Sequence, residues 1–369
     1  MVFRRLNALA KPNTKVQIQT HEFRQLSDWI APQQGLDQRD PFNAEATAPR
    51  LNAHDAAWLQ SLVQGLKHRL VVLHADLDGL CLGMLPLMHV RGPLFGSFLT
   101  SLPYLNTGGV WSSDPAIAKQ LIDRACELAD ELDVRHLELR HEQPIEHEQF
   151  NFQRCDKVHL RLSLPETAEA LNQSFKSKLR SQVKKSGQYD ATVSFGGLEK
   201  LDDFHHVFAR NMRDLGTPVY SKDLFRSIIN SFQGDAEFCI VKHEQVCSAA
   251  GLLIHRRGLT EIPSASSLRE FNRQGANMWM YWHALQRAIE RGSKVFDFGR
   301  SSEGSGTYKF KLQWGSVAEP ATWQYYVRKG DPAEMRPDSD RNQRLVKIWQ
   351  RLPVWLTKWI GPSIVRGIP

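Results

Sequence analysis

The sequence signatures that identify many protein classes are missing from this chain of 369 residues. No apolar run reaches the length of about 18 residues that a membrane-spanning helix needs. The start, MVFRRLNALAKPNT, has no apolar stretch long enough for a signal peptide. The five cysteines form no CxxC pair and follow no regular spacing, as is typical of reduced cytosolic thiols. These absences predict a cytoplasmic protein.

Motifs of the common enzyme classes are missing as well. The 14 histidines match no zinc spacing and no HExxH is present, so we expect no metal site. The sequence contains no GxSxG motif, which would indicate the nucleophilic serine of a hydrolase. The glycine patterns fit neither a Walker A loop nor a dinucleotide-binding fingerprint. The chemistry of this chain therefore has to be sought outside these motifs.

The composition is that of an ordinary globular enzyme, with 41% hydrophobic and 24% charged residues. The length suits two domains of roughly 150–170 residues each. A net charge of +7 and a pI near 9.1 favour an anionic partner. Nucleic acid, a phosphorylated carrier and an anionic membrane surface all fit, and so does a basic protein without such a partner.

The order of expected elements repeats at an offset of about 165 residues. The first set is a helix at His54–Gly65, strands at Arg69–His74 and Leu80–Val90, a strand at Pro93–Thr100, a helix at Asp114–Leu132 and a strand at Arg135–Arg140. The second set is strands at Glu237–Val241, Gln245–His255 and Leu259–Ser264, a helix at Asn277–Arg291 and a strand at Lys294–Phe298. The repeat rests on element order, because the two halves share little residue identity.

This repeat predicts two α/β domains, at residues 51–162 and 163–330. Residues 1–50 are an irregular lead-in, with a strand at Val16–Thr20 and a short helix at Glu22–Ile30. Residues 331–369 combine a polar linker with an amphipathic tail.

The segment Phe296–Gly315, FDFGRSSEGSGTYKFKLQWG, is the first candidate site. Asp297 lies inside an apolar strand, where a carboxylate is costly unless it is paired or functional. The glycines that follow allow backbone amides to approach a ligand, and the lysines bring positive charge. The alternative is a surface loop followed by an aromatic return strand.

Two helices give further candidates. The helix Lys176–Ser186 places Arg180 and Lys184 on one face, which is either solvated or a clamp for phosphate groups. The helix Leu198–Asp214 ends at Gly216, so Asn211 and Arg213 in its last turn face either solvent or a cleft.

Three motifs in a fixed order resemble FemAB-related proteins of the GCN5-related N-acyltransferase (GNAT) superfamily. They are KSKLRSQVKKSG, ARNMRDLGTPVYS, and NMWMYWHALQRAIERGSKV followed by FDFGRSSEGSGTYKFKLQWG. Together they cover most of residues 170–327. The type they resemble is the one associated with exosortase (PEP-CTERM) and exopolysaccharide systems.

The resemblance implies a tandem pair of GNAT domains, with mixed sheets flanked by helices. It also implies transfer of an acyl or aminoacyl group, from acyl-CoA or aminoacyl-tRNA, to an amine. The acceptor would be a glycan, a lipid-linked precursor or a peptide of the cell envelope. The helical hairpin that peptidoglycan-modifying relatives insert has no counterpart here, and the pyrophosphate loop of acyl-CoA enzymes is fragmentary at Arg273–Ala276. The donor therefore stays open.

Such a transfer needs a deprotonated amine, donors for an oxyanion and a proton for the leaving group. We expect Asp297 to orient or deprotonate the amine and Tyr308 to act as the acid. Backbone amides near Gly299–Gly306 are the expected oxyanion donors. The expected substrate- and donor-binding residues are Arg180, Lys184, Asn211, Arg213, Asn277, Trp282, Gly299, Arg300, Ser301, Gly306, Lys309, Lys311 and Trp314.

The tail Arg344–Pro369 alternates apolar and basic residues at near-helical spacing, interrupted at Pro353. It fits either an amphipathic segment at an anionic bilayer, here the inner-membrane surface, or a segment folded back on the protein. Two other functions stay open for the whole chain. One is a non-catalytic scaffold protein with a GNAT fold in envelope polysaccharide assembly, and the other is a module that binds tRNA or another nucleic acid.

Overall fold

The computed structural model describes residues 16–23, 52–77, 80–92, 95–112, 114–331 and 340–368. The expected N-terminal strand is present as β1 (Gln17–Phe23). A short helix is expected at Glu22–Ile30. Its first two residues, Glu22 and Phe23, belong to β1 instead, and the rest of it lies outside the described residues.

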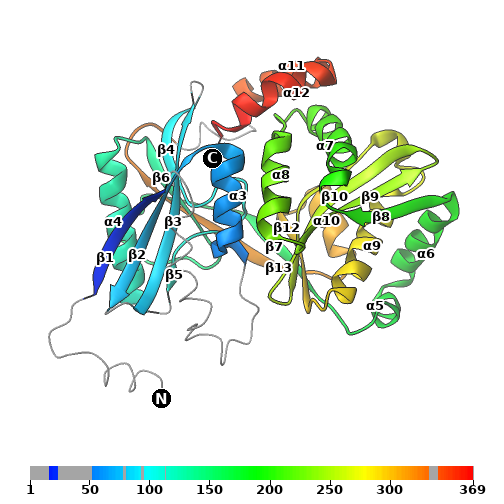
Figure 1. Ribbon diagram of the computed structural model, residues 1–369, viewed down its shortest axis with the longest axis horizontal. Coiled ribbons are helices and arrows are strands. Elements are labelled where there is room, and N and C mark those ends of the chain that lie inside the picture. Colours follow the sequence, from blue (N-terminus) through cyan, green and yellow to red (C-terminus); the bar gives the residue numbers. More distant parts are fainter. Residues whose placement is uncertain are drawn as a thin grey trace.

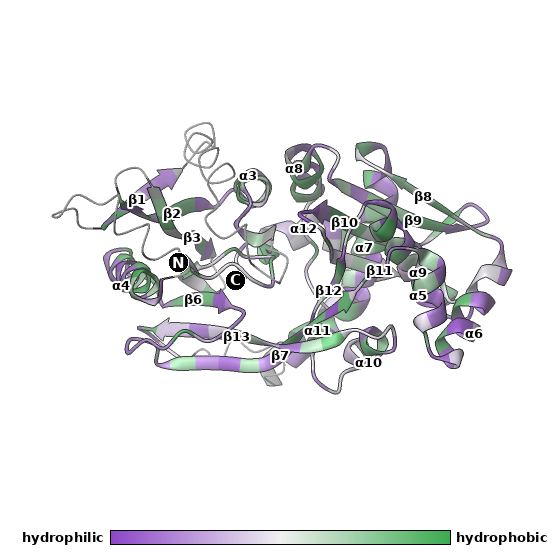
Figure 2. Cartoon of the chain, turned by 90° about the horizontal axis from the view of Figure 1, so that it is seen from below, coloured by the Kyte–Doolittle hydropathy of each residue, from purple (hydrophilic) through white to green (hydrophobic). Residues whose placement is uncertain are grey.

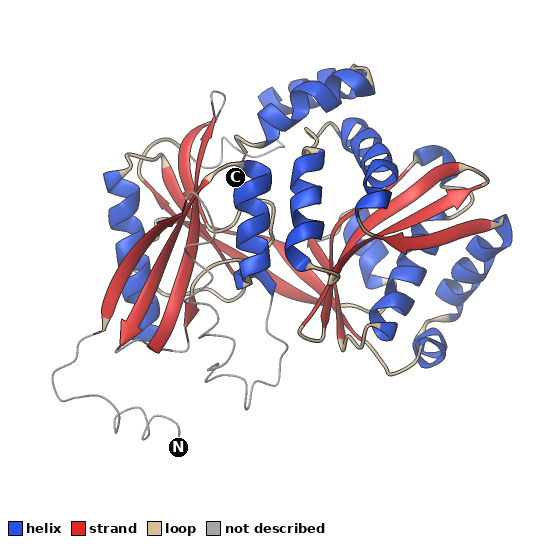
Figure 3. Ribbon diagram, in the orientation of Figure 1, coloured by secondary structure: helices blue, strands red, loops and turns tan. Residues whose placement is uncertain are grey.

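Two α/β lobes share one continuous 13-stranded sheet (Figures 1 and 3). The first lobe contains β1, β2 (Arg69–Leu77), β3 (Leu80–Gly92), β4 (Gly96–Thr100), β5 (Trp111–Ser112) and β6 (His136–His141). The second contains β8 (Ala191–Gly196), β9 (Ala236–His243), β10 (Val246–Arg256), β11 (Leu259–Ser267) and β12 (Val295–Ser302). The strands β7 (Phe152–Ser163) and β13 (Val317–Val327) lie between them.

The two lobes repeat the same strand order, as the sequence predicts. The path β1-β2-β3-β4-β6 in the first lobe corresponds to β8-β9-β10-β11-β12 in the second. In each, the last two strands of the path pair in parallel, β4 with β6 and β11 with β12, while the other neighbours are antiparallel. The predicted duplication of an α/β unit is therefore confirmed.

The lobes exchange their final strands. β7 follows the first lobe along the chain but pairs with β12 of the second, and β13 follows the second but pairs with β6 of the first. The two also pair with each other over most of their length. In Figure 2 they run side by side with alternating hydrophilic and hydrophobic bands, as expected for strands whose two faces differ.

Helices form layers on both faces of the sheet (Figure 1). The helix α4 (Pro115–Glu131) covers the outer face of the first lobe, and α9 (Ala276–Glu290) covers the outer face of the second. Between the lobes, α3 (Ala56–Leu66) packs against α8 (Lys222–Phe232), beside α7 (Leu201–Leu215). One apolar core joins α3, α7 and α8 to strands of both lobes, with the fully buried Trp58 at its centre.

Local sequence explains where these helices begin and end. Asp114 caps α4 by accepting a hydrogen bond from Ala116 N–H, and Pro115 occupies the first turn. The helix α7 ends at Gly216 with a left-handed backbone, as predicted. Ser305 caps a helix, α10 (Gly306–Leu312), that the sequence did not predict. The alternative of a surface loop followed by an aromatic return strand is therefore wrong for this segment, because a serine cap starts a helix there instead.

The C-terminal tail forms two helices, α11 (Asp340–Arg351) and α12 (Val354–Val365), with Pro353 as the N-cap of α12. Both contact α7, and Arg213 of α7 donates to the Leu352 carbonyl at 3.1 Å. The tail thus folds back on the protein. No helix in the described ranges is long and apolar enough to span a bilayer.

Candidate active site

The strands β11 and β12 separate soon after they begin. They pair in parallel only at Leu259–Glu261 and Val295–Asp297, although β11 continues to Ser267 and β12 to Ser302. Beyond Asp297, β12 pairs on its other side, with β7. Beyond Glu261 and Asp297 the two strands therefore have no ladder hydrogen bonds to each other, and on β12 this separation falls in the segment that the sequence identifies.

A bulge in β12 marks the same place. The register between β12 and β7 shifts between Asp297 and Arg300, so that three residues of β12 span what two span in β7. Gly299 lies in this bulge with a φ of +72°, a left-handed conformation that favours glycine. Its N–H donates to Asp297 Oδ1 at 2.6 Å, so the carboxylate fixes the bulge from within.

Asp297 is also part of a charged cluster around one arginine. Arg161 of β7 donates through Nε to Asp297 Oδ2 at 3.1 Å, through Nη1 to Glu319 at 2.7 Å, and through Nη2 to Glu142. Burial alone would lower the pKa of Arg161, but the Asp297 and Glu142 carboxylates outweigh it and raise that pKa. Both oxygens of Asp297 therefore accept hydrogen bonds from the protein, one from Arg161 and one from the Gly299 N–H.

Arg300 is stacked on an aromatic ring between the lobes. Its guanidinium carbon lies 3.5 Å from the ring centroid of Trp323, and that of Arg140 lies 4.0 Å from the same centroid. Trp323 is fixed by its Nε1–H, which donates to the Asn106 carbonyl at 3.2 Å. Arg140 pairs with the buried Glu138 at 2.7 Å. The stack brings together β12, β13, β6 and the loop that follows β4.

The charges of this stack do not balance. Glu138 is paired with Arg140, and the nearby Arg154 is paired with Asp156 at 3.1 Å. Within the described ranges Arg300 has neither an ion pair nor a hydrogen bond through its side chain, and the buried Nη2 of Arg140 has no partner. Burial, with the Arg140 charge beside it, lowers the pKa of Arg300 to about 9. An anion placed here would be stabilised by two guanidinium groups.

Lys311 supports the end of β12 from α10. Its buried ammonium donates to the carbonyls of Gly299 and Arg300 at 3.3 and 3.1 Å. Burial lowers the pKa of Lys311 to about 8, although the Asp297 charge acts in the opposite direction. This lysine therefore fixes the backbone of the bulge and is not directed to solvent.

A small cavity of about 30 Å³ lies where the two lobes meet this bulge. Its walls come from the first lobe, through Trp58, Tyr104 and Asn106, and from the second, through Asp297 and Gly299. The volume corresponds to about one water molecule. A group that enters it from a ligand therefore has to be small.

His159 of β7 also lines this cavity and was missed by sequence reasoning. The side chain is buried, and its Nε2 has no hydrogen-bond partner among the described residues. Burial lowers the pKa of His159 to about 4, against the influence of Asp297, so the imidazole is neutral at neutral pH. The available signal was the alternation of Lys157, His159 and Arg161 with apolar residues, which is typical of a strand with one charged face.

A second pocket, of about 370 Å³, lies at the N-terminus of α9. Its walls are the end of α6 (Ser177–Ser186), the loop before α9, the first turn of α9 and Phe310 of α10. Lys185 and Arg273 give it positive charge, and no side chain caps the helix. Gly275, with φ of +71°, lies so close to α6 that a Cβ there would be 2.3 Å from Ser186 Oγ.

The predicted site residues lie at several places in the structure. Asp297, Gly299, Arg300 and Lys311 come together at the bulge, and Asn277 lines the pocket at α9. Three more lie on α10: Tyr308 is half-buried against the apolar side chains between α9 and the sheet of the second lobe, and Gly306 and Lys309 are exposed. Lys184 is exposed on α6, and the buried Ser301 has an unpartnered Oγ.

The other predicted residues have structural contacts instead. Arg180 donates to the carbonyls of Gln173 and Phe175 at the end of α5 (Ala168–Ser174), which satisfies a helix C-terminus. Arg213 binds the tail. Asn211 donates to Ser266 of β11 at 3.1 Å. Trp314 is fully buried and Trp282 partly buried, and both pack against Phe175.

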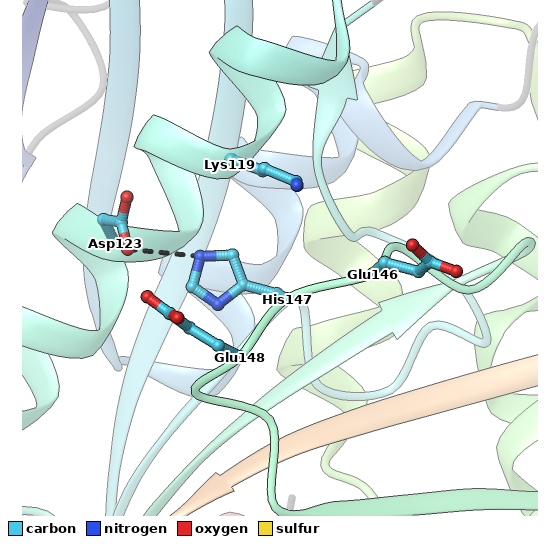
Figure 4. Close-up of a pocket in the computed structure, with 5 residues that line it drawn as sticks. All are labelled: Lys119, Asp123, Glu146, His147 and Glu148. Carbon is cyan, nitrogen blue, oxygen red and sulfur yellow. Dashed lines mark ion pairs between the residues drawn. The ribbon is translucent and has the colours of Figure 1, made fainter.

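A more open pocket of about 460 Å³ lies on the first lobe, away from these residues (Figure 4). It is lined by Lys119, Asp123, Glu146, His147 and Glu148, and His147 pairs with Asp123 at 3.2 Å. Nowhere in the described part of the chain are three or more His, Cys, Asp or Glu side chains grouped so that they could hold a metal ion.

Residues 173–312 match the family described as acetyltransferase (GNAT) domain, so the chain contains a GNAT domain. This range runs from α5 through the pocket at α9 and the bulge to the end of α10. No curated protein sequence matches the chain.

Solved structures of similar fold extend over both lobes. A structure described as FemX has a TM-score of 0.57 at 15% identity, covering 90% of this chain and 100% of that one. L-PGS from Bacillus licheniformis gives 0.54 at 12% identity, covering 88% and 98%. A tandem GNAT protein from the clavulanic acid biosynthesis pathway gives 0.50 at 11% identity, covering 86% and 99%.

The fold is thus a tandem pair of GNAT units, as predicted, and its second unit matches a GNAT domain. The similarity to the FemX structure agrees with the FemAB-type fold that the sequence predicts. At these identities the solved structures establish the fold alone. The association with exosortase systems stays a prediction.

Proposed function

We propose that the chain transfers an acyl group from a thioester donor to an amine, with the reaction centred where β11 and β12 separate. The observation that carries this proposal is the match of residues 173–312 to an acetyltransferase domain, because this range contains the separated strands, the pocket at α9 and one wall of the cavity between the lobes. In the reaction the amine nitrogen forms a bond to the acyl carbon, the carbon–sulfur bond breaks, and a proton passes from the amine to the departing thiolate.

The donor binds at the pocket before α9. The free N–H groups of the first helical turn, with Lys185 and Arg273, suit a diphosphate group such as that of acyl-CoA. The contact between Gly275 and α6 brings that helix close to the phosphate position. The acyl group then extends between β11 and β12, where unpaired N–H groups are available to the oxyanion of the tetrahedral intermediate.

The acceptor amine enters from the cavity between the lobes. His159 offers a neutral ring nitrogen for the amine proton, and Asp297 keeps the bulge and the amine in position. Tyr308, in the first turn of α10, is the proposed acid for the thiolate. Arg300 and Arg140 bind an anionic group, phosphate or carboxylate, that the acceptor carries beside its amine.

A second donor class is aminoacyl-tRNA. The exposed cations of α6, which is largely hydrophilic (Figure 2), favour it, because a row of lysines can bind a phosphate backbone. The acceptors to be considered are amines of envelope or exopolysaccharide glycans, of lipid-linked precursors and of peptides.

The test is a donor panel. The protein is incubated with acyl-CoAs and with charged tRNAs, together with amine acceptors that do or do not carry a phosphate, and products are identified by mass spectrometry. Release of free CoA with an amide product supports the proposal. Transfer from tRNA alone selects the second donor class, and binding without turnover of any donor supports the scaffold alternative.

A further inference from the structure

The C-terminal helices expose apolar side chains that the rest of the molecule does not cover. Trp355 and Trp359 of α12 are 69% and 76% exposed, and Leu345 and Ile348 of α11 are also exposed. Exposed tryptophans of this kind are expensive in water and usually have a partner. None of these four side chains takes part in the core contacts of either lobe in the described part of the chain.

The geometry of α12 shows that this exposure is not a result of loose packing. Thr357, Gly361 and Val365 are buried and follow each other at intervals of four, so they form the face that packs on the protein. Gly361 lies against Val219, where a Cβ would be 3.0 Å from the backbone. Trp355 and Trp359 are four residues apart and therefore share a face. Each is offset by two residues from the buried positions, so their face is on the opposite side of the helix. The helix is thus fixed by one side and presents tryptophans on the other.

The same segment carries nearly all of the net charge. The chain has 47 basic and 40 acidic residues, and residues 341–368 contain six basic and no acidic ones, which leaves 41 and 40 elsewhere. The six are Arg341, Arg344, Lys347, Arg351, Lys358 and Arg366. Residues 341–368 therefore carry six of the seven net positive charges, and the one acidic residue of the two helices is Asp340 at the start of α11.

We propose that α11 and α12 bind an anionic phospholipid bilayer, with Trp355 and Trp359 at the interface and the basic residues against the lipid phosphates. Tryptophan is favoured at the boundary between headgroups and acyl chains. Amphipathic helices rich in Lys and Arg lie flat in this boundary and bind anionic lipids. Aliphatic side chains such as Leu345 and Ile348 are stabilised there too, whereas a nucleic-acid backbone gives them no apolar contact.

The contacts that attach α11 and α12 to α7 fix the orientation in which the protein would bind a bilayer. Arg213 binds the Leu352 carbonyl, Gln350 donates to the Asp214 carbonyl at 3.1 Å, and Val346 packs against Gly216. All three contacts are to the end of α7, which is joined to β11 through Asn211. A bilayer that binds the tail therefore meets the molecule in one orientation.

The test is co-sedimentation of the full chain with vesicles of phosphatidylcholine alone and of phosphatidylcholine with an equal part of phosphatidylglycerol. We expect binding to the anionic vesicles, weakened by salt. The double variant Trp355→Ala/Trp359→Ala should bind at least about tenfold more weakly. Replacing Arg344, Lys347 and Arg351 with Gln should lower binding by about two orders of magnitude.

The matched control is Leu198→Ala/Val246→Ala, which removes two exposed apolar side chains far from the tail in the sequence and should leave binding unchanged. Equal binding of the tryptophan variant and the unmodified protein would overturn the proposal. So would a vesicle-free dimer that the tryptophan variant abolishes, because the surface would then belong to a second copy. Binding to tRNA with no binding to either vesicle would also overturn it, because the basic residues of the tail would then bind nucleic acid.

Discussion

At the scale of single residues, the site separates groups that fix geometry from groups that are free to react. Arg161 pairs with Asp297, and Asp297 and Lys311 each bind the backbone of the bulge. His159 and Arg300 lie in the same region with no hydrogen-bond partner at His159 Nε2 or at the Arg300 guanidinium within the described residues. Unpaired buried polar groups are costly, and in enzymes they are often paired only when the substrate binds.

His159→Gln tests the proposed base. Glutamine keeps a polar side chain of similar size but does not accept a proton, so we expect kcat to fall by about 100-fold with a small change in stability. The control is His205→Gln, since His205 is equally buried, its pKa is also lowered to about 4, and it binds the Tyr220 carbonyl outside the site. Undiminished turnover of the His159 variant would remove this residue from proton transfer.

Arg300→Gln should have opposite effects on binding and on stability. The variant loses a guanidinium that would pair with an anion, so we expect the KM for an anionic acceptor to rise by about 10- to 100-fold. It also loses a largely desolvated charge without a carboxylate partner, so the free energy of unfolding should stay the same or rise by about 1 kcal/mol. Steady-state kinetics and urea unfolding measure the two effects, with Lys294→Gln, an exposed cation just before β12, as control. A destabilised variant with an unchanged KM would indicate a purely structural arginine.

At the scale of elements, the sequence predicts those whose signals are local. Asp114 and Pro115 mark the start of α4, Gly216 marks the end of α7, and the apolar spacing of α9 is clear. It does not predict the partners of β7 and β13, because each pairs with a strand of the other lobe. It also does not predict α10, since the glycines around Ser305 disfavour a helix that the serine cap and the packing of Phe310 nevertheless stabilise.

The site shows the same limit. The sequence identifies the segment around Asp297 because an acid in an apolar strand is conspicuous. His159, Arg140 and Trp323 are ordinary strand residues until the sheet places them beside Arg300. Conversely, Arg180 and Trp314 are residue types that often bind ligands. Here Arg180 donates to a carbonyl at the end of α5, and Trp314 is buried in the core.

Gly275→Ala tests the helix α9 as a phosphate site. The added Cβ would meet Ser186 Oγ at 2.3 Å and would also strain a residue with φ of +71°. We expect α6 to move away from α9 and donor affinity to fall by about tenfold or more. Gly292→Ala, after the other end of α9, is the matched control, because it has φ of +76° but open space around the Cβ. Isothermal titration with CoA distinguishes the two, and equal losses would assign the effect to backbone strain alone.

At the scale of the whole molecule, buried histidines couple stability to pH. Five have a pKa lowered to about 4 by burial: His68, His89, His141, His159 and His205. Their folded-state pKa lies below the unfolded value of 6.5, so the unfolded chain binds more protons at acidic pH. Their stabilising effect is complete above about pH 6.5 and is lost as the pH falls from there toward 4.

We therefore expect the free energy of unfolding to fall steeply between about pH 6.5 and about pH 4, by roughly 1 kcal/mol per pH unit for each histidine. Urea unfolding followed by circular dichroism at several pH values measures this. The variant His205→Gln should lower the slope of the free energy of unfolding against pH by the contribution of one histidine. A midpoint that does not change between about pH 7 and about pH 5 would contradict the burial of these groups in the neutral form.

The exchanged strands determine how the protein can be made. As the chain leaves the ribosome, β6 has no partner on one side until β13 has been synthesised, since His141 pairs with Thr322. The edge of β6 therefore stays unpaired while the entire second lobe is synthesised. The pairing of β6 with β13 then joins residues that are far apart in the sequence. Neither half of the gene encodes a sheet that is complete in itself, so the two lobes reach their final structure together.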